Sequence, residues 1–262
     1  MTLVIDRMAI DDVGANPRKL AEAIIKQLPD GLKSTPVREI ARAIDIYEIR
    51  EEKLSGLEGA LIVSENKSEG SILINSESSP QRKRFTIGHE IGHYVNPTHR
   101  ANSNNKFECT RNDMRVAKAR PGDKRAKMEL QANQFAAELL MPTSWLKEFL
   151  RGKLGADIAH ILELAIQFEV SKEAASRCYL ASIDESAAII FSKAGVIRYV
   201  KKKNSFPRLS VWNGDNIPQD CISSASSRNV GEVTDVVETP GHIWLETSEG
   251  LSLGEQTLAQ QD

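Results

Sequence analysis

The sequence predicts an α+β protein in three parts: a domain of helices and one small sheet (residues 1–142), a helical segment (143–184) and a β-rich C-terminal domain (185–262). Apolar residues recur at helical spacing through most of the first 181 residues. Short β-branched runs, separated by glycine, serine and asparagine, interrupt that spacing between residues 44 and 75. From about residue 187, strand-like runs alternate with turn residues, so we expect a domain boundary near residue 184.

The composition is that of a globular protein with ordinary cores. The chain has 262 residues, of which 40% are hydrophobic, and 34 Lys and Arg stand against 36 Asp and Glu, a formal charge of -2. This balance excludes a strongly basic protein whose whole surface binds nucleic acid or an anionic membrane. Any such contact must therefore be local.

The cysteines give no sign of a disulfide framework. Cys109, Cys178 and Cys221 are widely spaced and form no CxxC pair, so we interpret them as reduced thiols outside any cysteine zinc site. The N-terminal residues include acids where a signal peptide needs an apolar core, and no apolar run reaches membrane-spanning length. We expect a cytoplasmic protein with no membrane partner.

The first domain should begin with helices and continue as a sheet. Residues 17–28 have helical apolar spacing and end before a Pro-Asp-Gly turn, and 36–44 read as a second helix with proline at its start. The β-branched runs that follow predict strands at 44–50, 59–63 and 71–75.

Capping residues mark two longer helices. Ser79 as N-cap and Pro80 in the first turn predict a helix over 80–95. Asp123 predicts another over 124–140, and the residues from 100 to 122 look irregular. Further expected elements are helices at 143–151, 156–168 and 171–181, and strands at 187–192, 196–200, 233–239 and 242–247.

The stretch RFTIGHEIGHYVNPTH, residues 84–99, carries two histidines four residues apart. On a helix, His89 and His93 differ by about 40° around the axis and by one turn along it, so both imidazoles can reach one metal ion. Glu90 lies about 60° beyond His93 and can sit beside the metal, where it would take a proton from the attacking water. This donor set suits catalytic Zn2+, with Mn2+ or another divalent metal as the alternative.

Two glycines border the histidines. Glycine inside a helix costs roughly 0.5 to 1 kcal/mol relative to alanine, so Gly88 and Gly92 indicate that another backbone packs closely there. Phe85 continues the same face. We therefore expect the histidines to border a buried surface rather than open water.

A third ligand has two candidates. His99 matches the histidine spacing of HExxHxxGxxH, but Asn96 stands in the glycine position and precedes Pro97, which favours extended geometry over a tight turn. We expect His99 near the site or in contact with substrate. It remains the alternative third ligand.

The second candidate lies on the helix over 124–140. Glu129 and Glu138 are nine residues apart and must point in opposite directions; Glu129 borders the apolar stripe, and Glu138 points away from it. We favour Glu129 as the third ligand, the alternative being an acid favoured by the helix dipole. Asn133, one turn later, can hydrogen-bond a ligating histidine.

The segments RFTIGHEIGH (84–93) and ELQANQFAAELLMP (129–142) resemble the signatures of the ImmA/IrrE family of bacterial and phage metallopeptidases. The resemblance implies a zincin-like peptidase domain, zinc on His89, His93 and Glu129, and Glu90 as the catalytic acid/base. It also implies a protein substrate, a helix-turn-helix transcriptional repressor, whose cleavage derepresses DNA-damage or mobile-element genes.

Members similar to IrrE carry a helix-turn-helix-like segment after the peptidase domain, and residues 162–180 are similar to one. Glu169 stands where a turn glycine is often found, and the second helix offers Lys172 and Arg177 as basic residues. Two other functions therefore stay open: a DNA-binding regulator with a structural or vestigial metal site, and a sensing or antitoxin-like partner that binds a regulator without cutting it.

Overall fold

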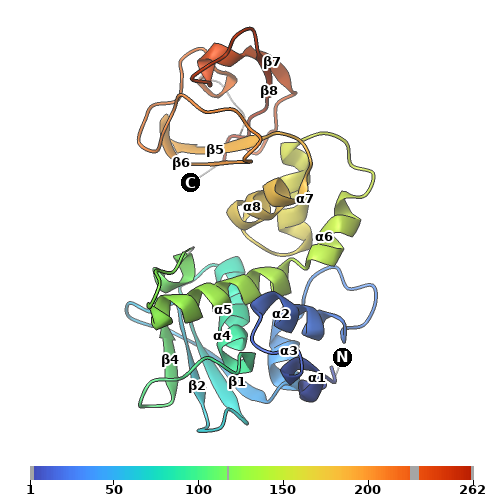
Figure 1. Cartoon of the computed structure of the whole chain (residues 1–262), viewed down its shortest axis with the longest axis vertical. Coiled ribbons are helices and arrows are strands. Elements are labelled where there is room, and N and C mark those ends of the chain that lie inside the picture. Colours follow the sequence, from blue (N-terminus) through green and yellow to red (C-terminus); the bar gives the residue numbers. More distant parts are fainter. Residues whose placement is uncertain (1–2, 117, 225–229, 261–262) are drawn as a thin grey trace. The chain divides into compact units, whose positions relative to one another are not determined.

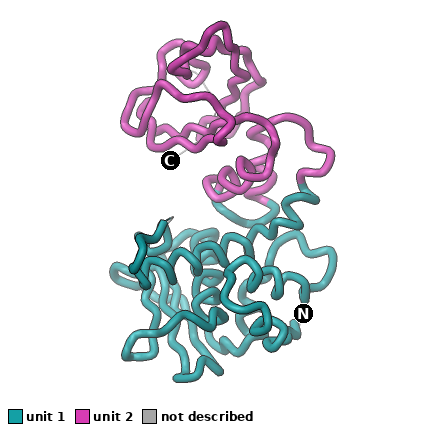
Figure 2. Tube along the Cα trace, in the orientation of Figure 1, with its two compact units in different colours: residues 1–149, 167–171 teal, residues 150–166, 172–262 magenta. Residues whose placement is uncertain are grey.

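A computed structural model describes residues 3–116, 118–224 and 230–260. The chain divides into two compact units: unit 1 holds Met1–Phe149 and Gln167–Ser171, and unit 2 holds Leu150–Ile166 and Lys172–Asp262 (Figure 2). Both units mix helices and strands, so the chain is α+β as predicted. The boundaries predicted near residues 142 and 184 stay a prediction.

Unit 1 combines helices with a small sheet (Figure 1). Helices and strands lie where the spacing predicted them, although α2 ends three residues before residue 28. Three elements were not predicted: the short helix α1, and, in the segment expected to be irregular, strand β4 and the 3-10 turn Asp113–Arg115. The bounds are α1 Arg7–Asp11, α2 Pro17–Ile25, α3 Val37–Ala43, β1 Ile46–Glu52, β2 Gly59–Val63, β3 Gly70–Asn75, α4 Pro80–Val95, β4 Lys106–Cys109, α5 Lys124–Leu140 and α6 Thr143–Leu150.

The sheet of unit 1 has the strand order β1-β3-β2-β4. β1 runs parallel to β3, whereas β2 runs antiparallel to both β3 and β4. Alternate residues of β3 are buried, as a half-buried strand requires, and Ile72 and Ile74 are fully enclosed. Within the described residues, β4 forms one edge of this sheet.

Helices α4 and α5 pack closely against each other. Ser79 caps α4 by accepting from the Arg82 amide, and Asp123 caps α5 by accepting from the Ala126 amide, as predicted. A Cβ on Gly92 would lie 3.2 Å from the Cα of Ala132 on α5, and a Cβ on Gly88 would lie 3.4 Å from the Ala136 Cβ. The close backbone approach predicted from these glycines is confirmed.

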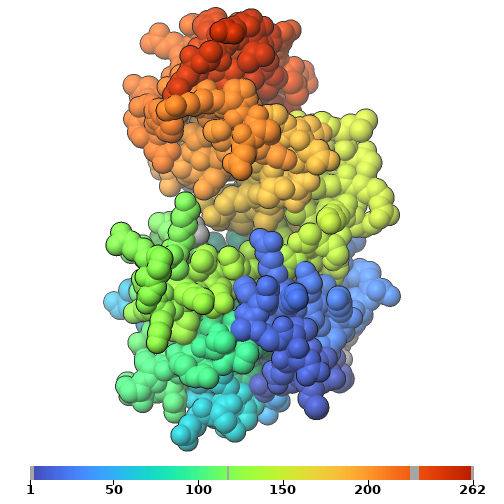
Figure 3. All heavy atoms as spheres, in the orientation of Figure 1, coloured from blue at the N-terminus to red at the C-terminus, as the bar shows by residue number. Residues whose placement is uncertain are grey.

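Helix α2 packs against α5 as well, although the two helices lie far apart in the sequence. Figure 3 shows this face of unit 1 with all heavy atoms, where the early part of the chain, in blue, adjoins later, green parts. Leu20 and Ile24 of α2 are fully buried, as are Phe135 and Leu139 of α5. The α4–α5 pair is therefore held in a packed interior.

Unit 2 has its own core of buried residues. The strands predicted over 187–192 and 196–200 are confirmed: β5 and β6 pair antiparallel, and Gly195 between them takes a φ of +77°. Its elements are α7 Ile158–Gln167, α8 Lys172–Ser182, β5 Ala188–Lys193, β6 Val196–Lys202, β7 Val237–Pro240 and β8 Ser252–Glu255. Its core consists of Ile197, Leu209, Val211, Cys221, Trp244 and Leu245.

The strand predicted over 242–247 is wrong. Gly241–Ile243 is a turn of 3-10 helix, closed by the amides of Trp244 and Leu245, which both donate to the Gly241 carbonyl. Trp244 and Leu245 follow this turn and are buried in the core of unit 2, where Leu245 forms an isolated antiparallel β-bridge with Leu209. The strand that pairs with β7 is β8, which was not predicted.

No helix in the described part of the chain is long and apolar enough to cross a bilayer.

Candidate metal centre

The two histidines of the HExxH motif point to the same spot from α4. One turn separates them, and their Nε2 atoms lie 3.1 Å apart. Both side chains are fully buried. Phe85, expected on the same face, is half-buried, and the motif borders a closed interior as predicted.

Glu129 reaches this spot from α5. Its Oε2 lies 3.1 Å from the His89 Nε2 and 3.4 Å from the His93 Nε2. Glu138, the other acid of α5, is turned away as predicted and makes different contacts, because its carboxylate accepts from the amide and the hydroxyl of Thr143 at the start of α6. The helix geometry thus brings together the three predicted ligands His89, His93 and Glu129.

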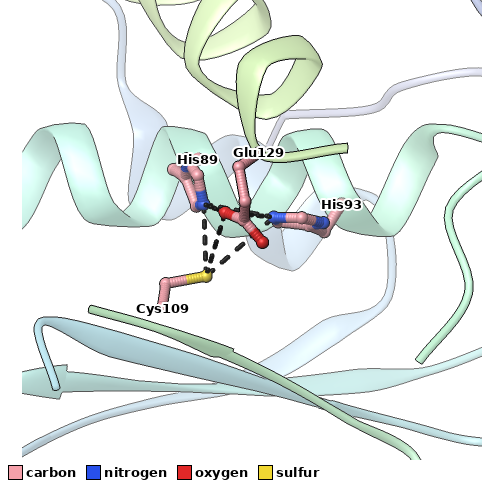
Figure 4. Close-up of side chains that lie close together, drawn as sticks. All are labelled: His89, His93, Cys109 and Glu129. Atoms are coloured by element: carbon pink, nitrogen blue, oxygen red, sulfur yellow. Dashed lines mark hydrogen bonds and ion pairs between the residues drawn. The ribbon is translucent and has the colours of Figure 1, made fainter. Parts of the chain in front are cut away.

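A fourth donor, Cys109, was missed at the sequence level. Its Sγ lies 3.2 Å from the His89 Nε2 and 3.9 Å from both the His93 Nε2 and the Glu129 Oε2. Figure 4 shows the thiol rising from β4 toward the three ligands of the helices. All three cysteines are free, as predicted, but the expectation that none belongs to the metal site does not fit this geometry.

The orientation of His89 is fixed by Asn133. The His89 Nδ1 lies 2.9 Å from the Asn133 Oδ1, while the Asn133 amide nitrogen donates to the carbonyls of Asp113 and Val116. The amide oxygen must therefore accept, so the His89 Nδ1 carries a hydrogen and directs the Nε2 to the cluster. The role predicted for Asn133 behind a histidine is confirmed.

His99 lies behind His93 in a similar way. Its Nδ1 is 3.1 Å from the His93 Nδ1, and its Nε2 is 3.1 Å from the Gln131 Oε1. If His99 donates through Nε2 to Gln131, its Nδ1 accepts from the His93 Nδ1, which leaves the His93 Nε2 lone pair facing the cluster. His99 is fully buried and contacts His93 rather than joining the four-atom cluster.

Glu90 sits beside the cluster without joining it. Both of its carboxylate oxygens are buried, and neither accepts a hydrogen bond from any described residue within normal geometry. Burial raises the pKa of Glu90 to about 7, partly offset by His89 and by the neighbouring Cys109 thiol. Gly59 of β2 makes room for this side chain, since a Cβ there would lie 3.1 Å from the Glu90 Oε1.

The charges of the cluster are strongly coupled. Burial by itself lowers the pKa of His89, but the hydrogen bond to Glu129 and the charges of Glu90 and Glu129 raise it above its ordinary value. Burial lowers the pKa of His93 to about 4. Burial alone would raise the pKa of Glu129, yet its hydrogen bonds with both histidines hold it far below its usual range. The Glu129 carboxylate therefore stabilises the protonated form of His89.

The residues fit a divalent metal. Their donor atoms all lie within 4.8 Å of one another and are all buried. Nitrogen, carboxylate oxygen and sulfur are the ligands that zinc accepts, and hydrogen bonds from behind hold the histidines in the tautomer that ligation requires. The Glu90 carboxylate next to them is buried without a hydrogen-bond partner among the described residues, which indicates that a polar or cationic group binds beside it.

Tyr94 and His99, which lie close to the motif in the sequence and could donate to an oxyanion, have their polar atoms engaged by other residues. The Tyr94 hydroxyl accepts a hydrogen bond from Arg7 at 3.0 Å, and Arg7 also pairs with Asp45. Both ring nitrogens of His99 are occupied by His93 and Gln131. The donor stays unassigned.

An HExxH helix packed against a second helix that supplies a glutamate defines a metallopeptidase centre. The chain belongs to the ImmA/IrrE metallopeptidase family: the IrrE N-terminal-like domain matches residues 48–178, half of its length. The resemblance inferred from the two sequence segments is thereby confirmed. A search among curated proteins found no match.

Proposed function

We propose that the protein is a zinc endopeptidase with a zincin-like catalytic unit. The observation that carries this proposal is the convergence of His89, His93 and Glu129 beside an unpartnered, buried Glu90. Membership of a metallopeptidase family agrees with it. Zinc is the metal we favour, because its catalytic sites use histidine nitrogens with a carboxylate oxygen.

The ligand residues would hold the metal, and Glu90 would move the proton. When bound, a divalent metal polarises the scissile carbonyl and activates a water for attack. The Glu90 carboxylate would accept the water's proton and pass it to the nitrogen of the leaving amine. A pKa near neutrality suits a group that must both take and release a proton.

The edge strand β4 offers a way to hold an extended peptide. It ends at Cys109, beside the metal ligands, and forms one edge of the sheet in the described part of the chain. A substrate strand that adds to this edge would carry its scissile bond past the cluster. Backbone pairing of this kind binds the peptide independently of most of its side chains.

The substrate we propose is a helix-turn-helix transcriptional repressor, cut in a stress or mobile-element response. This part of the proposal comes from the ImmA/IrrE resemblance. The test is co-expression with repressors encoded near the gene. Wild-type protein should yield repressor fragments, and Glu90→Gln should leave the repressor intact while keeping the metal, with about a 100- to 10,000-fold loss in rate. Equal fragmentation by both proteins would remove Glu90 from the mechanism.

A DNA-binding regulator is the second candidate. Glu169, between α7 and α8, takes a φ of +53°, the conformation for which a turn glycine is often chosen. The basic residues of α8 are few, however, and Arg177 lies 3.9 Å from Glu173. Salt-dependent binding of duplex DNA by the full chain would support this candidate, and the peptidase proposal expects none of appreciable strength.

A further inference from the structure

Strand β4 turns two neighbouring side chains of one face toward α4. Residues 107 and 109 are buried, while the residues between and before them are more exposed. Phe107 lies under His93, with ring centroids 4.7 Å apart, and Cys109 lies under His89. The strand therefore supplies a packing contact to one histidine and a sulfur to the other.

The four donor atoms form a tetrahedron of the size that zinc needs. Zn–N and Zn–O distances near 2.0 Å and Zn–S near 2.3 Å require edges of about 3.3 Å between nitrogen or oxygen atoms and about 3.5 Å to sulfur. The three edges among His89, His93 and Glu129 are 3.1, 3.1 and 3.4 Å. The three edges to the Cys109 Sγ are 3.2, 3.9 and 3.9 Å.

A second observation points to a ligand at the same place. The side chain of Glu90 is fully buried next to the cluster, and its two oxygens lack hydrogen-bond partners among the described residues. A buried carboxylate left in this way signals a missing cation or water.

Simple core filling does not account for Cys109. Cys221 shows what core filling looks like: it is also buried, lies in the apolar core of unit 2, and donates to the Pro218 carbonyl at 3.0 Å. Cys109 instead approaches the metal-binding atoms of His89, His93 and Glu129. Its polar neighbours are these ligand atoms and the carboxylate of Glu90.

We propose that Cys109 is a fourth, displaceable metal ligand, so that the resting protein holds its metal in a closed His-His-Glu-Cys site and is latent until a bound substrate displaces the sulfur. Four protein ligands fill a tetrahedral zinc site, whereas catalysis needs one open position. The inference rests on the proposed peptidase function. Binding of the sulfur releases the thiol proton to solvent, opening the site returns it, and no electron is transferred.

The test uses Co2+ in place of the native metal, because a cobalt–thiolate bond gives a charge-transfer absorption that nitrogen and oxygen ligands do not give. The full-length wild type should show this band with one Co2+ per chain. The double variant Cys178→Ala/Cys221→Ala, which keeps Cys109 alone, should show the same band. Cys109→Ser and Cys109→Ala should lose it, and their Co2+ affinity should fall about 10- to 100-fold.

Latency is tested with azide, a small anion that occupies an open metal position. Azide should shift the cobalt spectrum of Cys109→Ala and leave the spectra of the wild type and of the matched control Cys221→Ala unchanged. If the wild type responds to azide as Cys109→Ala does, the closed site is overturned.

The outcomes separate this inference from the proposed function. Stoichiometric Co2+ without the charge-transfer band in the wild type would overturn the role of Cys109 and leave the three-ligand peptidase site in place. A wild type that binds no Co2+ at all would overturn both. The wild-type spectrum alone decides between these outcomes, so the test stands even if a Cys109 variant misfolds.

Discussion

Two glutamates, one in each unit, differ in the number of hydrogen bonds that their carboxylates accept. In unit 2, Glu255 accepts hydrogen bonds from Thr239 and from the Trp244 indole, at 3.0 and 3.1 Å, and longer ones from Ser223. In unit 1, Glu90 is fully buried and accepts none from the residues described. Since a buried, unpaired carboxylate costs free energy, its presence beside metal-ligating side chains indicates function rather than stability.

The residues that surround Glu255 and Glu90 differ in the same way as the two carboxylates. The polar groups around Glu255 satisfy one another, so this part of unit 2 is complete as protein alone. The polar groups around Glu90 converge on a point where a cation would complete them. The following substitutions break or sharpen this comparison, from the largest expected effect to the smallest.

The largest effect is expected from Glu129→Ala. It removes the carboxylate that reaches both histidines, so metal affinity should fall by more than the roughly 10- to 100-fold that residues behind the ligands contribute. Glu138→Gln is the matched control, because Glu138 is a buried acid of the same helix that only caps α6. Competition with a chromophoric chelator measures both affinities. Equal affinities would return the third-ligand role to His99.

His99→Ala should weaken the metal site without abolishing it. The substitution removes the acceptor for the His93 Nδ1 hydrogen, and such supporting residues contribute about 10- to 100-fold to metal affinity. The metal should remain measurable at high concentration. Complete loss comparable to that of Glu129→Ala would show that His99 binds the metal directly.

Glu90→Gln and Glu255→Gln should change stability in opposite directions in the metal-free protein. Glutamine removes the charge that Glu90 must bury, so the free energy of unfolding at pH 8 should rise by about 3 kcal/mol. Glu255→Gln weakens hydrogen bonds to a charged acceptor and should lower it by about 1 to 2 kcal/mol. Urea denaturation in the presence of a chelator measures both.

The advantage of Glu90→Gln should depend on pH. The pKa of Glu90 is raised from 4.5 to about 7 in the folded protein, so between these values the folded state binds more protons than the unfolded state. The free energy of unfolding of the wild type therefore decreases, relative to that of Glu90→Gln, as the pH rises from 4.5 to 7. The two proteins should be equally stable below pH 4.5, and an advantage that persists there would assign the effect to packing.

The smallest effects are expected at the two motif glycines. A Cβ on Gly92 would lie 3.0 Å from the Phe135 Cδ1 and 3.2 Å from the Ala132 Cα, so Gly92→Ala should cost about 1 to 2 kcal/mol despite its better helix propensity. Gly88→Ala meets only ordinary contacts, from 3.4 Å outward, and should be neutral or stabilising by up to about 1 kcal/mol. Thermal unfolding compares them, and equal shifts would contradict the packing described.

Local signals in the sequence predicted much of the metal centre. Helical spacing places His89 and His93 on one face, and capping by Ser79 and Asp123 sets the bounds of α4 and α5. The nine-residue separation of Glu129 and Glu138 makes them point in opposite directions, and the apolar stripe of the helix shows that Glu129 is the one that faces the histidines. These features depend on residues within one helix and can be read from it.

What the sequence did not predict depends on contacts between distant segments. The run around Cys109 is short and follows a polar stretch, so nothing local marks it as a strand that pairs with β2 and lies under α4. Gly59 is the one local sign of this arrangement, because its missing side chain leaves space for Glu90. In unit 2, Trp244 and Leu245 have strand-like composition but follow a 3-10 turn, and both are buried in the core of this unit.

The most direct test of the account is a crystal structure of chelator-free, purified protein, with anomalous scattering recorded at the absorption edge of the bound metal. We expect a single strong peak at bonding distance from the Nε2 atoms of His89 and His93 and from the Glu129 carboxylate. A peak bound elsewhere, or the absence of any peak with Glu129 still turned toward both histidines, would contradict the account.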